Sequence, residues 1–265
     1  MTNQLFSEFA PLLRNLNQQE LLAEIDRPTR LLVADDFFRG RRIEVAYAAF
    51  DHINRDAEVV IVGLTPGRQQ MRNALIEAQR CLKAGHAETD ALKAAKKFAS
   101  FSGPMRSNLV AMLDCVGLGT ALGLKSTASL WEGDAPRVHF TSALRYPVFI
   151  DGENYSGAPS MISTPILHSH LMQWFALEMK QLSKVVFIPL GPKVTEAIEG
   201  VAKQLSLSGD RILSGMPHPS GANAERIAFF LGRKNRDDLS NKVNPEQLRA
   251  ARASLKNKIA MWRLT

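Results

Sequence analysis

A continuous run of β-branched residues, Val59-Val60-Ile61-Val62, is the feature of the sequence that most restricts the fold. Strands that are buried on both faces of a parallel sheet have such unbroken apolar runs, whereas half-exposed strands alternate apolar and polar residues. The run ends in Gly63, and a helical pattern follows from Met71 to Leu82. The sequence therefore predicts a buried strand over Glu58–Leu64 that leads directly into a helix.

The same order of strand and helix recurs three more times along the chain. Alternating strands and helices form parallel sheets that helices cover on both faces. We therefore expect an α/β fold, specifically a three-layer α/β/α sandwich with a central four-stranded parallel sheet. The other strands are predicted at Val138–Ala143, Val185–Leu190 and Arg211–Ser214, and the helices that follow them at Ile166–Leu182, Lys193–Leu205 and Ala224–Leu231.

With 265 residues, 45% of them hydrophobic, we expect the chain to form one globular domain. Residues 1–57 are expected to be a helical extension that packs on the core, with helices over residues 3–25 broken near Pro11. Residues 58–232 would form the α/β core, and residues 233–265 a basic, helical tail that includes Pro245–Trp262. The segment Tyr146–Pro165 is predicted to be a long loop, and Arg39, Arg41 and Arg42 are expected to lie on a solvated face.

The net charge of +7 and a pI near 9.6 favour a polyanionic partner such as nucleic acid. Cys81 and Cys115 are too few for a disulfide framework, a four-cysteine zinc site or an all-cysteine iron–sulfur cluster. Neither a secretion signal nor an apolar run of membrane-spanning length is present in the sequence. We therefore expect a cytoplasmic protein with no metal, no cofactor and no membrane contact.

A histidine between two prolines is the strongest candidate for chemistry. His218 lies in the stretch Gly215–Asn223, after the last predicted strand and before a predicted helix. Prolines fix φ on both sides of the histidine, and ligands bind at the carboxyl ends of strands in open α/β sheets. Ser220, Gly221 and Asn223 add small side chains and amides at a helix start, which favours anions. The alternative is a rigid turn with a surface histidine.

A second loop follows the first strand at the same predicted edge of the sheet. It comprises Gly63-Leu64-Thr65-Pro66-Gly67 and is followed by Arg68. Proline and glycine are common in ordinary strand-to-helix turns, so the loop carries little functional information by itself. Its combination with the His218 stretch, in this order, is more informative.

The two loops together resemble the motifs of the uracil-DNA glycosylase superfamily, in which a Gly-x-x-Pro-Gly-like loop precedes a His-Pro-Ser motif. Phe101-Ser102-Gly103 looks like the family's Phe-x-Gly segment, and Val138–Ser142 resembles its strand ending in Thr-Asn. Leu190-Gly191 matches the Leu-Gly that closes the third strand. The resemblance covers roughly Glu58–Leu231 and is greatest to the thermophile-type members.

The sequence also departs from that family. The cysteines of the thermophile-type iron–sulfur cluster are missing, so no such centre is implied. Thr65 stands where several branches have a water-activating Asp or Asn, and Pro104 stands where another branch has its catalytic Asp. Ser142 replaces an asparagine that hydrogen-bonds the pyrimidine edge. Asp151 and Glu153, in the predicted long loop, are other candidates for the missing carboxylate.

The resemblance implies a catalytic site made of His218 and Thr65. His218 would stabilise charge on the departing base, while Phe101 would stack on a base flipped out of the DNA. The smaller Ser142 leaves room for a bulkier base than uracil. Gly63, Leu64 and Gly67 complete the base-binding residues, and the DNA-binding candidates are Arg68, Ser220, Asn223 and Arg226.

The function expected from these residues is that of a monofunctional DNA glycosylase acting on uracil or, more in keeping with Ser142, on a modified or damaged base. It would act as a monomer on single- or double-stranded DNA, in base-excision repair or in defence against modified foreign DNA. Two alternatives stay open: a catalytically weak DNA-binding member of the same fold, and a nucleotide- or small-molecule-binding α/β enzyme.

Overall fold

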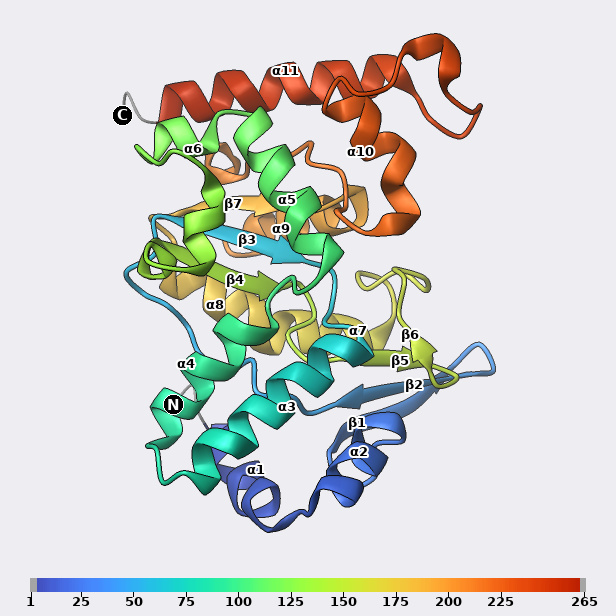
Figure 1. Cartoon of the computed structure of the whole chain (residues 1–265). Helices are drawn as coiled ribbons and strands as arrows, with labels where there is room; N and C mark the ends of the chain where they lie inside the picture. The colour runs from blue at the N-terminus through green and yellow to red at the C-terminus, as the bar shows by residue number, and fades with distance from the viewer. Residues whose placement is uncertain (1–3, 263–265) are drawn as a thin grey trace. The chain divides into compact units, whose positions relative to one another are not determined.

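The computed structural model describes residues 4–262 and has a mixed α/β architecture (Figure 1). The chain divides into two compact units that both draw on separate segments of the sequence. Unit 1 comprises the described residues up to Arg55, Leu64–Ser100 and Phe140–Ser183. Unit 2 comprises Asp56–Gly63, Phe101–His139 and the described residues from Lys184 onward.

A parallel sheet of three strands, ordered β4-β3-β7, confirms three of the predicted strands. β3 and β7 pair in register from Val59↔Val186 to Val62↔Pro189, and every residue of both strands is buried. This complete burial is what the unbroken apolar runs predict. The strands are β3 (Val59–Gly63), β4 (Val138–Ser142) and β7 (Val186–Pro189).

The fourth predicted strand, Arg211–Ser214, is not formed as a strand. The segment makes one isolated parallel bridge, Phe187↔Ile212, and Met216 beyond it makes another with Leu190. Gly215, between the segment and Met216, has a φ of +117°, which extended backbone does not allow. The prediction of a four-stranded parallel sheet is therefore corrected to three strands flanked by a bridging segment.

A separate antiparallel sheet in unit 1 was not predicted. Its order is β1-β2-β5-β6. β1 and β2 form a hairpin whose turn residues, Arg39 and Gly40, both have positive φ, as the type I′ hairpin turn requires. The sheet brings Arg42 within 2.6 Å of Asp35 and Arg41 within 2.7 Å of Asp151. The strands are β1 (Leu32–Phe38), β2 (Arg41–Ala46), β5 (Val148–Ile150) and β6 (Glu153–Asn154), so two of them lie inside the predicted long loop.

The N-terminal helices end and begin elsewhere than predicted. α1 continues through Pro11 to Asn15, so the break predicted near Pro11 is wrong. α2 instead begins after Asn17, whose side chain accepts from the Glu20 backbone N–H while the Glu20 carboxylate accepts from the Asn17 N–H. This capping box stabilises a helix start. The helices of unit 1 are α1 (Gln4–Asn15), α2 (Gln18–Asp26), α3 (Arg68–Lys83), α4 (Glu88–Ala99), α7 (Pro165–His170) and α8 (Ala176–Gln181), the last two joined by a π-helical segment, Leu171–Phe175.

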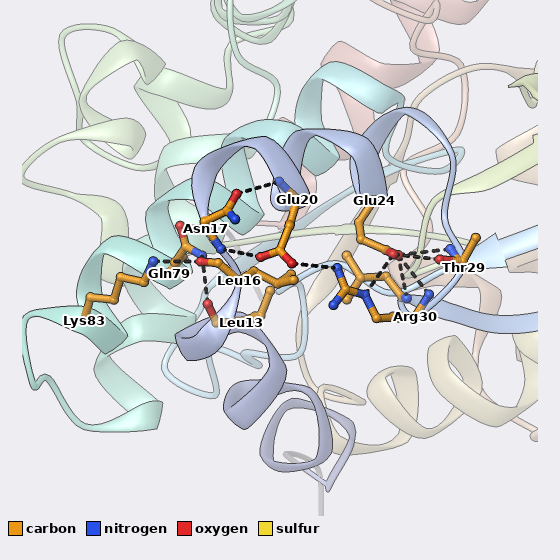
Figure 2. Close-up of polar contacts among 10 residues, drawn as sticks. Leu13, Leu16, Asn17, Glu20, Glu24, Thr29, Arg30, Gln79 and Lys83 are labelled. Atoms are coloured by element: carbon orange, nitrogen blue, oxygen red, sulfur yellow. Dashed lines mark hydrogen bonds and ion pairs between the residues drawn. The ribbon is translucent and has the colours of Figure 1, made fainter.

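Side chains of α3 bind the carboxyl end of α1 (Figure 2). The Gln79 amide donates to the carbonyl oxygens of Leu13 and Leu16, at 2.8 and 2.9 Å, and Lys83 donates to Leu16 at 2.8 Å. These carbonyls have no partner within their own helix.

Figure 2 also shows the Glu24 carboxylate accepting from the N–H groups and side chains of Thr29 and Arg30. Burial raises the pKa of Glu24, but these hydrogen bonds outweigh it and the pKa is lowered.

The remaining α-helices belong to unit 2, which also contains His218. α11 packs against α10 and α6 (Figure 1), with Leu255 and Ile259 buried. Its bounds are those predicted from the sequence. No helix within residues 4–262 is long and apolar enough to cross a membrane. The helices are α5 (Pro104–Cys115), α6 (Leu118–Ala121), α9 (Pro192–Gln204), α10 (Ala224–Phe230) and α11 (Pro245–Trp262).

Candidate active site

The turn that carries His218 begins directly at the end of the parallel sheet. Met216 bridges Leu190, and the Gly191 N–H donates to the Met216 carbonyl at 2.8 Å. Gly191 has a φ of +94°, and a Cβ there would lie 3.3 Å from the Cβ of His218. Only glycine meets both conditions without strain. The Leu-Gly pair that ends the third predicted strand therefore sets the position of the histidine.

The imidazole of His218 is held in one neutral tautomer. Its Nδ1 accepts a hydrogen bond of 3.3 Å from the backbone N–H of Ser220. An accepting Nδ1 carries no proton, so the neutral ring carries its proton on Nε2. Burial lowers the pKa of His218 below its ordinary value, which keeps the ring neutral at pH 7. His218 is thus an uncharged donor at Nε2.

Three predicted DNA contacts of unit 2 instead form a chain of hydrogen bonds behind the turn. Asn223 donates to the Ser220 hydroxyl at 3.2 Å, and Arg226 donates to Asn223 at 3.4 Å. Arg226 also donates to the carbonyl of Lys242 at 2.7 Å. Asn108, which the sequence did not single out, donates to the Pro219 carbonyl at 2.9 Å. These side chains therefore hold the turn in place through their hydrogen bonds.

The first loop belongs to unit 1 from Leu64 onward. The Thr65 hydroxyl donates to the Tyr146 carbonyl at 2.9 Å and accepts from the Val148 N–H at 3.2 Å, while Leu144 N–H donates to the Leu64 carbonyl at 3.0 Å. Because a hydroxyl has a single proton, Thr65 has none left to donate to a ligand in this state. Thr65 joins the loop to the segment that precedes and begins β5.

Arg68 directs its guanidinium into unit 1. It donates to the carbonyls of Ile25 and Asp26 at the end of α2, at 2.5 and 2.6 Å, and to that of Gly152 at 2.6 Å. The guanidinium also lies 4.1 Å from the Phe149 ring centroid. A cation at a helix carboxyl end is favourable. These contacts give Arg68 a structural role, in place of the exposed position that a phosphate contact needs.

Gly67 is the N-cap residue of α3 in unit 1, and its N–H donates to Gln70 at 3.1 Å. A Cβ on Gly67 would lie 3.6 Å from Asn154, which also accepts from the Arg68 N–H at 2.9 Å. Gly63 is the last residue of β3, in unit 2. The five-residue loop is therefore continuous in sequence but is divided between the two units.

Phe101 and Ser142 also belong to different units. Phe101, in unit 2, is buried and has a φ of +48°, which is unusual for a large side chain. Ser142, in unit 1, is half-buried at the end of β4.

Asp151, a candidate for the missing carboxylate, accepts from the Arg41 side chain and the Arg42 N–H, and this environment lowers its pKa. Asp151 is therefore engaged in the antiparallel sheet.

Sequence reasoning missed a buried cluster of charged and phenolic groups in unit 1. Asp51 accepts from the hydroxyls of Tyr47 and Tyr146, at 2.9 and 2.6 Å. Arg145 forms an ion pair of 2.7 Å with Glu178, and both side chains are almost fully buried. A carboxylate inside a protein is stable only when it is paired or hydrogen-bonded. The cluster therefore fixes residues 145 and 146, the second of which accepts from Thr65.

Lys96 adds a further charge to this part of unit 1. Its Nζ donates to the His52 carbonyl at 2.6 Å, and its side chain is buried. Burial lowers the pKa of Lys96 to about 8, although Glu178 and Asp51 favour its charged form. Lys96 lies at an apolar position of α4, beside the buried residues Ala95 and Ala99. The apolar periodicity of α4, in which Lys96 occupies a buried position, is the signal in the sequence that predicts its burial.

Within residues 4–262, no three or more His, Cys, Asp and Glu side chains are grouped so that they could hold a metal ion. The chain matches no protein-family model, and no solved structure matches it. It is 38% identical over 195 residues to the uncharacterized protein YoxB of Bacillus subtilis (strain 168). The aligned part covers 73% of this chain and 75% of YoxB. At this identity and coverage, the chain belongs to the same protein family as YoxB.

Proposed function

We propose that the chain is a monofunctional DNA glycosylase that hydrolyses the N-glycosidic bond of uracil or, more in keeping with Ser142, of a modified or damaged base. The observation that carries the proposal is the geometry of His218, a neutral Nε2–H donor held at the end of a parallel strand. The proposal includes the three-layer α/β/α arrangement of the resembled family, with residues 212–216 in the place of the fourth strand.

Departure of a pyrimidine places negative charge on the base and positive charge on the sugar, as in other glycosidic cleavages. A donor fixed before the reaction stabilises that charge without reorganisation. The Nε2–H of His218 supplies this donor to a carbonyl oxygen of the departing base. Its low pKa keeps the ring uncharged, so the ring does not need to lose a proton before substrate binds.

Stacking on the base is assigned to Phe101, which belongs to the same unit as His218, while the kind of base is inferred from Ser142 through the family resemblance. A base that undergoes such chemistry must leave the stack, and an aromatic face replaces the lost stacking. The positive φ of Phe101 supports this role, since strained backbone is concentrated at functional sites. A serine hydroxyl forms fewer contacts with a base edge than an asparagine amide and occupies less volume. We therefore propose a base larger than uracil as the substrate.

The distribution of charge supports a DNA partner. Unit 2 contains 17 Lys and Arg against 12 Asp and Glu, a formal charge of +5 out of the total of +7. Phosphate backbones bind such basic surfaces, with an affinity that falls as salt rises. The unit that contains His218 is thus also the more basic one.

The decisive experiment incubates the protein with single-stranded and duplex oligonucleotides that contain uracil, damaged bases or hypermodified pyrimidines, and detects abasic sites. His218→Ala should lose about 10²-fold or more in kcat, the usual cost of removing one such donor. His218→Gln, which keeps a neutral N–H donor, should retain more activity than the alanine variant. The exposed His86→Ala is the matched control. Equal activity of His218→Ala and His86→Ala would exclude the assigned role.

A catalytically weak DNA-binding protein of this fold is the second candidate. It is favoured by the engagement of two of the residues considered for water activation: the Thr65 proton is donated to the Tyr146 carbonyl, and Asp151 is paired with Arg41. This candidate predicts DNA binding that weakens with salt but no abasic product from any oligonucleotide. Product from any base in the panel would exclude it.

A further inference from the structure

The helix α11 touches the turn that carries His218. Gly215, three residues before His218, has a φ of +117°. A Cβ placed on Gly215 would lie 3.1 Å from the Cβ of Ala251 and 3.3 Å from the Ala251 carbonyl oxygen. Both distances are shorter than nine in ten Cβ contacts in real proteins, so a neighbouring atom would have to move by a few tenths of an ångström. The backbone of the turn therefore lies directly against one alanine of the C-terminal helix.

Hydrogen bonds and buried side chains attach the C-terminal segment, which includes α11, to α10. Arg252, next to Ala251, donates to the Phe230 carbonyl at the end of α10, at 2.8 Å. The Lys242 carbonyl accepts from Arg226, and Glu225 accepts from Lys234 at 2.8 Å. Together with the burial of Leu255 and Ile259, these bonds attach the segment to α10 at several points.

The turn is thus closely packed at two positions, Gly215 and His218, where a Cβ added to Gly215 or to Gly191 would force a neighbouring atom to move. Gly191 lies against the Cβ of His218, and Gly215 lies against Ala251. Between Gly215 and His218 the chain contains only Met216 and Pro217, and the φ of Pro217 is fixed. A shift of Ala251 toward Gly215 therefore moves His218 itself, because the intervening residues have little freedom to absorb it.

We propose that Ala251 is a positioning residue for His218, and that it acts through its contact with Gly215. The proposal extends the function proposed above to residues outside the segment that resembles the glycosylase family. Its effect on activity rests on that function, but the orientation of His218 can be measured independently. Misplacement of a catalytic group by about 1 Å lowers rates by up to about 10²-fold.

The first test replaces Ala251 by leucine, with Ala253→Leu on the exposed side of the same helix as the matched control. We expect Ala251→Leu to lower kcat at least about 10-fold with little change in KM, whereas Ala253→Leu stays at the wild-type rate. Side-chain ¹⁵N NMR of the histidines should show that the His218 signals of the neutral Nε2–H form change in Ala251→Leu alone.

The second test keeps the proposal falsifiable if Ala251→Leu does not fold. Gly215→Ala introduces the Cβ that meets Ala251, and Ala251→Gly in the same chain removes the nearest of the atoms it meets, the Ala251 Cβ, but leaves the backbone of residue 251. We expect the double variant to recover part of the kcat and of the His218 NMR signals that Gly215→Ala loses. The positive φ of Gly215 prevents full recovery.

These measurements separate the two proposals. If the wild-type protein forms no abasic product, the glycosylase proposal fails, while the NMR comparison still tests the positioning role. Unchanged His218 signals and rates in Ala251→Leu would overturn the positioning role. A double variant no better than Gly215→Ala would also overturn it, because the contact between the two residues would then have no effect.

Discussion

The two candidate loops are held by different kinds of force. The Thr65 loop, residues 64–67 in unit 1, is held by a hydroxyl bonded to Tyr146, which in turn bonds the buried Asp51. The His218 turn, residues 215–223 in unit 2, is held by hydrogen bonds, such as those that Asn108 and Asn223 donate, and also by two glycines packed against neighbouring atoms. The Thr65 loop thus depends on buried polar bonds, whereas the His218 turn adds close packing at positions without side chains.

This difference determines what each loop tolerates. Buried polar networks stabilise strongly when complete and are costly when one partner is lost. A close packing contact is insensitive to charge and pH but fails when a few atoms are added. We therefore expect the Thr65 loop to respond to charge and pH, and the His218 turn to respond to volume.

Loss of Arg145 should have the largest effect on stability. Arg145→Ala removes the cation that pairs with the fully buried Glu178, and breaking such a pair costs about 3–5 kcal/mol. Urea unfolding followed by fluorescence would measure the loss in the free energy of unfolding. Arg236→Ala is the control, because its pair with Glu246 is exposed and worth less than about 1 kcal/mol. Similar losses of unfolding free energy in both variants would contradict the claim that the buried Arg145–Glu178 pair stabilises unit 1.

The pH dependence of stability should show the buried charge of Lys96. Its pKa is lowered from 10.5 to about 8 in the folded chain, so between these values the unfolded chain binds more protons. The free energy of unfolding should then rise with pH over this window, by at most about 1.4 kcal/mol per pH unit. Lys96→Met should remove the rise. A wild-type curve parallel to that of Lys96→Met from pH 8 upward would refute this prediction.

Gly191→Ala tests the role of volume beside His218. The new Cβ would lie 3.3 Å from the His218 Cβ in a backbone with φ of +94°, and the strain should cost about 1–3 kcal/mol. Gly200→Ala, in α9 with no atom near the new Cβ, should instead stabilise by about 0.5–1 kcal/mol. Thermal unfolding of both variants checks the difference in sign. Equal shifts would show that close packing at Gly191 is unimportant.

Thr65→Val tests the polar bonds that hold the first loop. It keeps the shape of the side chain but removes the bonds to the Tyr146 carbonyl and the Val148 N–H, at a cost of about 1–3 kcal/mol per unsatisfied buried group. Thr65→Ser keeps the hydroxyl and should remain near the wild type in stability and activity. A serine variant as impaired as the valine variant would show that the methyl group, and not the hydroxyl, holds the loop.

Much of the fold follows from patterns along the chain. The strands β3, β4 and β7 and the helix α11 lie where apolar periodicity predicts them. The antiparallel sheet of unit 1 does not, because β2 carries charges and some of their partners are distant in sequence, as in the pair of Arg41 and Asp151. Local periodicity contains no record of those pairs.

The sequence identifies the candidate catalytic histidine but not the residues that hold it in position. The His-Pro-Ser motif identifies His218, yet no local signal shows that Ser220 fixes its tautomer or that Ala251 limits its turn. Arg68 looks like a phosphate contact in sequence because its true partners are backbone carbonyls, which every residue has. Contacts to the backbone leave no trace in side-chain chemistry.

The pairing of β3 with β7 also has a consequence for synthesis. Val59 pairs with Val186, so a completely apolar strand emerges from the ribosome long before its partner exists. At about 5–20 residues per second, the wait is on the order of ten seconds. During that time Val59–Gly63 is a hydrophobic segment with unpaired backbone groups, the kind of segment that aggregates. Nascent chains that stop before β7 should therefore depend on chaperones, and complete chains should not.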